Sequence, residues 1–571
     1  MWDVHLLHIN DFNMGCLALG GFIVIFSMLA LFVKDKLYIN EVVLGTAFGI
    51  ACGPYGLDIV NPRSWGSGDS NTVTLEFLRI VLATGLFAIG VELPRAYMLE
   101  HARGLLIFVV PTMAAGWIIV AALIHALIPP LPFLSTLLIS ACLTPTDPII
   151  CSTIVGGPYA IKHIPLQLRR LLAAESAAND GLAYPFLSLA VYLVTMGEGG
   201  VGEAVGKWFV VGWVWEVGFG TGLGAVLGIM FSWVLRKAYQ KGLVDRESFV
   251  AQYLALAVFT TGIASALGAD DLLAAFAAGS AISWDGHFNT RTEGQLFSSV
   301  IDFIINCACF IYIGAWLDFS AFHPSVPGLL GAEEGLLRVN LELGRLFVLL
   351  IGIFALRRIP IAMVLYRWVP EIDGWKEALF AGHFGTMGVG ALFVSTLALT
   401  RLPPPPESGP PTTQQELLAS VLHPIVSFVV LGSIVVHGFS ITFFSFGKKA
   451  SRRIAWYKDH KRRQSSPDSL SASTSKDEEP EPAINGGLAE GLNRPSFHST
   501  SDSLDSGLPT AAVVMRSTNG VTPTIPAVTP NGGIEMNRMG RPGAGVRSEE
   551  SRVSASSCHH RVGQCSLADG G

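Results

Sequence analysis

Charged residues are scarce in this chain of 571 residues: only 14% are Asp, Glu, Lys or Arg, whereas 50% are hydrophobic. The mean hydropathy is +0.49, and soluble domains carry about a quarter charged residues. The composition therefore excludes an ordinary soluble domain and indicates a chain that crosses a membrane several times. The net charge of −6 gives no sign of a nucleic-acid partner, and none is expected.

Cysteine patterning is also missing, because the eight cysteines show no disulfide framework and no zinc-binding spacing. The N-terminus lacks the basic patch and short apolar core of a cleavable signal peptide. We therefore expect the first apolar segment to be retained as a helix. No cofactor is expected.

Apolar segments recur along the first 446 residues. A membrane-spanning helix needs about 20 residues, and thirteen segments qualify, so the predicted fold class is an all-α membrane protein. The predicted spans are 12–33, 39–60, 75–93, 104–127, 131–155, 168–195, 207–235, 248–267, 270–284, 295–317, 339–366, 377–400 and 417–446.

The composition changes after residue 446. Residues 447–571 are rich in Ser, Pro, Gly and charge, which is typical of disorder. We therefore predict a transmembrane domain over 1–446 and a largely disordered cytosolic tail over 447–571. Lys and Arg gather on the side of the membrane that holds this tail, and the positive-inside rule then places the N-terminus outside. The "RRQSS" that follows the basic cluster resembles a phosphorylation site.

Polar residues interrupt the apolar sixth span in "AAESAANDGLAYPF". At 100° per residue, Glu175, Ser176, Asn179 and Asp180 share a face of about 140°. An ionised carboxylate in the bilayer centre costs about 2.5–3.5 kcal/mol. These acids must therefore face a partner, a cavity or a bound cation. A purely structural acid pair is the alternative.

Two prolines interrupt the preceding span in "TPTDP", residues 144–148. Proline has no amide hydrogen and clashes with the carbonyl four residues back, so the helix should unwind there. Irregular backbone at membrane depth is tolerated where it lines a cavity or is buried in protein. Freed carbonyls, Thr146 and Asp147 beside Ser176 and Asp180 would make a set of hard oxygen ligands for Na⁺. A proline kink capped by Asp147 is the alternative.

A second interruption is "GHFGTMGVGAL", residues 382–392, with four glycines. Inverted-repeat transporters place broken helices at corresponding positions, crossing near the midplane. If the seventh span is a linker, the broken fifth span pairs with the broken twelfth. Glycines that only permit close packing are the alternative.

Two arginines lie within the eleventh span, in "LRRIPIAM". A buried arginine stays charged and needs an anion, and Glu175 is the expected partner. Arginines that reach the membrane surface along the helix are the alternative.

These motifs resemble the monovalent cation/proton antiporter superfamily, and more narrowly the fungal plasma-membrane Na⁺/H⁺ antiporters. The resemblance covers about residues 10–450 and rests on "TPTDP", "ESAANDGLAYPF", "LGADDLLAAFAAG", "GHFGTMGVGAL" and "GSIVVHG" in that order. It implies that Asp180 carries the cation and the proton, with Asn179 beside it and Ser176 and Thr146 as further ligands. It also implies an ion pair between Glu175 and Arg358, with Arg357 as the other candidate.

The resemblance further implies export of Na⁺, together with K⁺ and Li⁺, in exchange for H⁺. Alternating access, a homodimer and a role in salt tolerance and pH homeostasis belong to the same expectation. Asp270 and Asp271 match an acidic pair of the fungal members, and two interpretations stay open: attraction of cations to a vestibule, or simple capping of a helix.

Rival functions are a passive cation channel, another proton-coupled transporter and an intramembrane enzyme. The chain has no selectivity-filter motif of the TVGYG type. It also has no protease, zinc or Ser-His constellation with the needed spacing. Exchange of cation for proton is therefore the preferred hypothesis, and the chain is not expected to be an enzyme.

Overall fold

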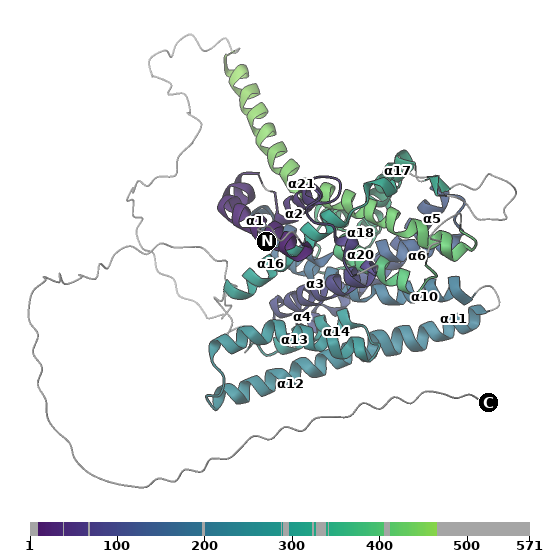
Figure 1. Ribbon diagram of the computed structural model, residues 1–571. Helices are drawn as coiled ribbons and strands as arrows, with labels where there is room; N and C mark the ends of the chain where they lie inside the picture. Colours follow the sequence, from purple (N-terminus) through teal and green to yellow (C-terminus); the bar gives the residue numbers. More distant parts are fainter. Residues whose placement is uncertain are drawn as a thin grey trace, which may run out of the picture. The chain divides into compact units, whose positions relative to one another are not determined.

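The computed structural model describes residues 10–464, apart from 38, 67–68, 197–199, 287, 289–295, 323–324, 327–338, 341 and 405–410. Nearly all of the described chain is helical (Figure 1). Its only described strands are two residues long: β1 (Ser325–Val326) pairs antiparallel with β2 (Val339–Asn340). The all-α prediction is confirmed.

Each predicted span coincides with one helix or with consecutive helices. One set, called group 1, packs together around the N-terminal helices and the middle of the chain. Its members are α1 (Asp11–Leu31), which continues into η1 (Phe32–Leu37), α2 (Glu41–Cys52), α3 (Ser70–Glu92), α12 (Gly220–Gln240), α13 (Arg246–Ala266), α14 (Asp271–Ile282) and α16 (Leu296–Trp316).

The second set, called group 2, contains the spans with the polar interruptions. Its members are α5 (Ala102–Leu127), α6 (Phe133–Leu143), α7 (Pro148–Val155), α9 (Leu166–Gly181), α10 (Ala183–Met196), α17 (Leu343–Leu356), α18 (Ile359–Leu365), α19 (Trp375–His383), α20 (Val389–Thr400) and α21 (Gln414–Gln464).

Short elements connect these helices. They are η2 (Pro62–Ser64), α4 (Tyr97–Glu100), α8 (Pro158–His163), α11 (Val201–Lys207), the π-helical η4 (Trp208–Phe219), η5 (Phe319–Phe322) and η6 (Tyr366–Trp368). The last residues of α10 lead through α11 and η4 into α12, so the predicted seventh span joins group 2 to group 1.

Glycine lets the helices of group 1 approach one another closely. A Cβ on Gly279 of α14 would clash with the backbone of Phe87 on α3, and one on Gly224 of α12 would clash with the carbonyl of Ala274 on α14. Small residues at such contacts are the usual packing device of membrane helices. In Figure 1, α12 lies beside α14, and α13 is a further neighbour of α14.

Six single helices among the described residues are long and apolar enough to cross a membrane, and the bent pair α6–α7 makes a seventh. The breaks after α6 and α19 fall at the segments that carry the prolines and glycines. The last helix, α21, differs from the predicted boundary at residue 446 by continuing to Gln464 (Figure 1). The rest of the predicted tail, 465–571, lies outside the described residues.

Candidate functional site

Two helix interruptions meet in group 2. The chain leaves helix between Leu143 and Pro148, with a bend of 41°, and again between His383 and Val389. The amide of Asp147 donates to the carbonyl of Thr386 at 2.7 Å, and the Thr386 hydroxyl donates back to the Asp147 carbonyl at 3.1 Å. The breaks predicted from the prolines and glycines are therefore present, and they cross as the predicted pairing requires.

Asp147 lies at the beginning of two helices at once. One carboxylate oxygen accepts from the amide of Ile150 at 2.7 Å in the first turn of α7, and the other accepts from the amide of Val389 at the start of α20. Gly388 makes room, because a Cβ there would clash with the Asp147 carboxylate. The negative charge thus balances the positive ends of two helix dipoles.

Arg357 lies at the carboxyl-terminal ends of two helices, α6 and α19. Its guanidinium donates to the carbonyls of Leu143 at 2.5 Å and Thr144 at 3.0 Å after α6, and to that of Gly385 at 2.5 Å after α19. These carbonyls have no partner within their own helices, so one cation satisfies both ends. Sequence reasoning considered Arg357 only as a partner for Glu175 and missed this role, although the carbonyls freed before each break were a signal for it.

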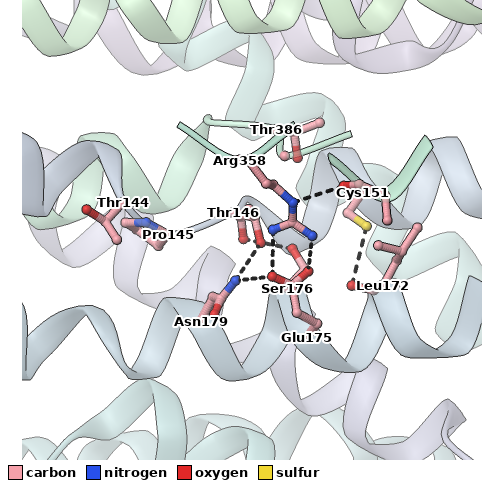
Figure 2. Close-up of polar contacts among 12 residues, drawn as sticks. Thr144, Pro145, Thr146, Cys151, Leu172, Glu175, Ser176, Asn179, Arg358 and Thr386 are labelled. Carbon is pink, nitrogen blue, oxygen red and sulfur yellow. Dashed lines mark hydrogen bonds and ion pairs between the residues drawn. The ribbon is translucent and has the colours of Figure 1, made fainter. Parts of the chain in front are cut away.

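Arg358 pairs with Glu175. The two guanidinium Nη atoms donate to the two carboxylate oxygens at 2.6 and 2.8 Å, while Nε donates to the carbonyl of Ala381 at 2.9 Å. The guanidinium also lies 5.0 Å from the ring centroid of Phe108. Figure 2 shows Arg358 reaching to Glu175 across the crossing. Of the two arginines considered, the neighbour of Glu175 is therefore Arg358.

The predicted ligands lie beside this ion pair (Figure 2). The Asn179 amide donates to Glu175 at 2.5 Å and to the Thr146 hydroxyl at 3.1 Å. Ser176 donates its hydroxyl to the carbonyl of Thr146 at 2.7 Å. The unwound segment after α6 and the polar face of α9 are thus joined directly.

Asp180 differs from its neighbours. Its side chain is 1% exposed, yet neither carboxylate oxygen has a hydrogen-bond partner. It lies against the start of α20, where a Cβ on Gly390 would clash with the carboxylate. The side-chain oxygen of Asn179 also lacks a donor. Buried acceptors are normally satisfied, so these oxygens are placed to receive a proton or a cation.

The donor atoms near Asp180 are mostly oxygens. No three His, Cys, Asp or Glu side chains gather as metal ligands anywhere in the described part of the chain. Asn179 directly precedes this unpaired carboxylate and Ser176 lies about one turn before it on α9, and both bond to Thr146. Hard oxygen ligands of this kind suit small hard cations.

Asp270 and Asp271 are buried, at 0% and 2% exposure, rather than open to a vestibule. Asp270 caps α14, because its side chain accepts from the amide of Leu273 at 2.8 Å. This is the capping alternative left open by the sequence. Asp271 pairs instead with Arg79, whose Nε lies 3.2 Å from a carboxylate oxygen.

A cavity of about 700 Å³ opens between the two groups. Glu41 and Glu92 from group 1 line it, together with Thr153 and His437 from group 2. Asn40 bridges the groups there, donating to the Thr153 hydroxyl at 3.1 Å. The cavity reaches α7, whose first residue follows Asp147, so it approaches the crossing from one end of the helices.

The chain resembles known transporters along most of its length. It is 40% identical over 451 residues to a Na⁺/H⁺ antiporter of Saccharomyces cerevisiae, covering 77% of this chain and 44% of that protein. It is 36% identical over 439 residues to a Na⁺/H⁺ antiporter of Schizosaccharomyces pombe, covering 76% of this chain and 90% of that protein. It spans about half the length of three of its relatives, the Saccharomyces cerevisiae protein among them, between 44% and 56%.

The fold has a solved counterpart in the sodium proton antiporter MjNhaP1 from Methanocaldococcus jannaschii. The TM-score is 0.52 at 15% identity, covering 76% of this chain and 99% of that one. Residues 22–447 match the family described as sodium/hydrogen exchanger, transmembrane. With the family match over most of the described chain and near-complete coverage of a 36% identical relative, this protein belongs to the sodium/hydrogen exchanger family.

Proposed function

We propose that this protein is a secondary antiporter that exports Na⁺ in exchange for H⁺, with Asp180 carrying both in turn. The single observation that supports this most directly is the buried Asp180 carboxylate, whose two oxygens have no hydrogen-bond partner. A bare buried carboxylate is costly. Binding either a proton or Na⁺ removes that cost, so the two compete for one group.

Ser176, Thr146 and Asn179 are the further ligands in this proposal. Their oxygens lie within the hydrogen-bonded cluster next to Asp180. Asp147 and Arg357 hold the two unwound segments in place through the helix ends, and the pair of Glu175 with Arg358 braces α9 against α18 and α19. Only Asp180 is then free to exchange partners.

Movement of group 2 against group 1 would provide alternating access. The cavity of about 700 Å³ opens between the groups at one end, as a site facing one compartment requires. A loaded Asp180 has a reduced charge and crosses the barrier, whereas the empty anion is held back by desolvation. The movement of Na⁺ is therefore coupled to that of H⁺, because only a loaded site crosses.

The finer expectations stand on the resemblance to the fungal antiporters. We infer that K⁺ and Li⁺ are carried as well and that the protein serves salt tolerance and pH homeostasis at the plasma membrane. The N-terminus lies outside, the transmembrane domain spans 1–446, and 447–571 forms a cytosolic tail open to phosphorylation. Group 1 is the part through which a homodimer would form in the bilayer.

The test is cation-dependent proton flux in proteoliposomes, with Na⁺, K⁺ and Li⁺ compared at imposed membrane potentials. Asp180→Asn should reduce flux to that of empty vesicles, because an amide cannot exchange a proton for a cation. Asp373→Asn, at an exposed residue, is the matched control and should transport normally. Normal exchange by Asp180→Asn would remove Asp180 from the carrier role, and flux independent of imposed Na⁺ would favour a channel.

A further inference from the structure

A partly buried charged cluster lies where the groups meet, away from the cavity of about 700 Å³. Arg79 of α3 lies with its Nε 3.2 Å from Asp271 at the start of α14, in an ion pair that is not aligned as a hydrogen bond. Arg79 also donates to the Ser265 hydroxyl at 2.7 Å. All three residues belong to group 1.

Two contacts connect this cluster to group 2. The hydroxyl of Tyr184 on α10 donates to Asp271 at 2.9 Å. The guanidinium carbon of Arg79 lies 5.9 Å from the ring centroid of Phe393 on α20, within cation–π range. The cluster therefore holds the two groups together beside the Asp180 site.

A second cavity, of about 450 Å³, lies between α3 and α13 of group 1, and Arg79 and Ser265 of this cluster line it. It is lined by Glu76, Arg79 and Ala83 of α3 and by the end of α13. The larger cavity is lined by the other half of α3, from Thr84 to Glu92. The two cavities thus approach α3 along different halves of its length.

Asp271 lies between the smaller cavity and Asp180. Arg79 lines that cavity, and Asp271 is buried behind it. Two residues further along α14, Leu273 packs on Gly181, where a Cβ would come within 2.8 Å of the Leu273 side chain. Gly181 directly follows Asp180 in the chain. A series of contacts, from Arg79 to Asp271 to Tyr184 and from Leu273 to Gly181, therefore connects the lining of the smaller cavity with the neighbourhood of Asp180.

We propose that Arg79, Asp271 and Tyr184 form a gate that closes the smaller cavity from Asp180 and opens when group 2 moves against group 1. This inference rests on the proposed antiport function. Arg79 and Asp271 both belong to group 1, so their charges stay paired in either state and no buried charge is left alone. Within this cluster, opening breaks the Tyr184 hydrogen bond and the Arg79–Phe393 contact.

The decisive variant is Tyr184→Phe, which removes the hydroxyl and keeps the ring. Losing one net hydrogen bond shifts an equilibrium about fivefold, here toward the state open to the smaller cavity. Apparent affinity at each face scales with the population of the state open to it. In oriented proteoliposomes, the ratio of the half-saturating Na⁺ concentrations at the two faces should therefore change about fivefold. Na⁺ should bind more tightly at the face of the smaller cavity.

Tyr192→Phe on the same helix is the matched control and should leave the ratio unchanged. Arg79→Lys keeps the positive charge but loses the planar guanidinium that lies over Phe393 of group 2, and should shift the ratio in the same direction. A lower maximal rate with an unchanged ratio in both gate variants would show an ordinary packing role and overturn the gate.

Hydrogen–deuterium exchange gives a readout that does not need transport. Tyr184→Phe should speed amide exchange in residues 70–83 and 265–273 relative to the unmodified protein, whereas Tyr192→Phe should not. If the unmodified protein moved no Na⁺, the proposed function would fail while this difference still reported the gate. Equal exchange in all three proteins would overturn the gate even if Na⁺/H⁺ exchange were intact.

Discussion

Glu175 and Asp180 are two acids on the same helix, each 1% exposed, with opposite surroundings. Both oxygens of Glu175 are bonded, to Arg358 and to Asn179. Neither oxygen of Asp180 is bonded. Equal burial therefore does not give equal roles: the paired acid holds helices together through its ion pair, and the unpaired one is free to change its partner.

The comparison extends to the two arginines of "LRRIPIAM". Arg358 neutralises a side chain, whereas Arg357 satisfies the carbonyls at two helix ends. Asp147 accepts hydrogen bonds from backbone amides at the amino-terminal ends of two other helices. Four ionisable groups are thus committed to holding the crossing, and a fifth is left for exchange.

The largest expected effect is a difference in stability between the Glu175 and Asp180 variants. Glu175→Gln leaves Arg358 buried without its anion, and breaking such a pair from one side costs about 3–5 kcal/mol. Asp180→Asn removes an unsatisfied buried carboxylate and should leave stability equal or higher. Thermal or denaturant unfolding of the purified proteins measures both.

Glu342→Gln is the control for the Glu175 experiment, because its pair with Arg345 at 3.7 Å is exposed. Exposed pairs contribute about 0–1 kcal/mol. If Glu175→Gln unfolded no more easily than Glu342→Gln, the ion pair would not be what secures α9.

The next effect concerns Arg357. Arg357→Lys keeps the charge, but a single ammonium cannot reach the carbonyls after α6 and after α19 together. Hydrogen bonds from charged groups contribute about 1.5–3 kcal/mol, so we expect a loss of about 2–4 kcal/mol in unfolding free energy. Arg367→Lys, at an exposed residue, should have little effect. Equal stability of the two variants would mean that the helix ends at the crossing do not need Arg357.

A smaller loss of stability is expected when a third acid is placed beside Glu175 and Asp180. Asn179→Asp removes the donor to Glu175 and Thr146 and adds a second unpaired carboxylate. We expect a loss of about 1–3 kcal/mol, the usual result of leaving buried groups unsatisfied. Asn61→Asp is the control, since either residue caps a helix equally well. If Asn179→Asp were as stable as Asn61→Asp, a third carboxylate at this place would not destabilise the fold.

The sequence was sufficient where local chemistry decides the structure. Prolines in "TPTDP" and glycines in "GHFGTMGVGAL" predict the two breaks, and "ESAAND" predicts a polar helix face. The extent of α21 was harder to predict, because the basic segment after residue 447 has no proline or further glycine before Gln464 and can continue as helix although it is polar.

The sequence was insufficient where distant segments meet. Which adjacent arginine reaches Glu175 depends on a helix rotation fixed by α5 and α19. The burial of Asp270 and Asp271 depends on η4, α3 and α10, which supply the Glu216 backbone contact, Arg79 and Tyr184. Spacing along the chain carries no information on such contacts.

The smallest expected effect tests whether the second break is supported apart from the charged groups. Ser433 of α21 accepts a hydrogen bond from the Met387 amide at 2.8 Å, within the segment between α19 and α20. Ser433→Ala leaves that buried amide without an acceptor, which costs about 1 kcal/mol. Ser420→Ala is the control, because its hydroxyl only donates to a carbonyl of its own helix. Unfolding curves that coincide for both variants would mean that Asp147 and Arg357 hold the break without help from α21. A lower stability of Ser433→Ala alone would mean that the last helix also helps to keep Asp180 facing α20.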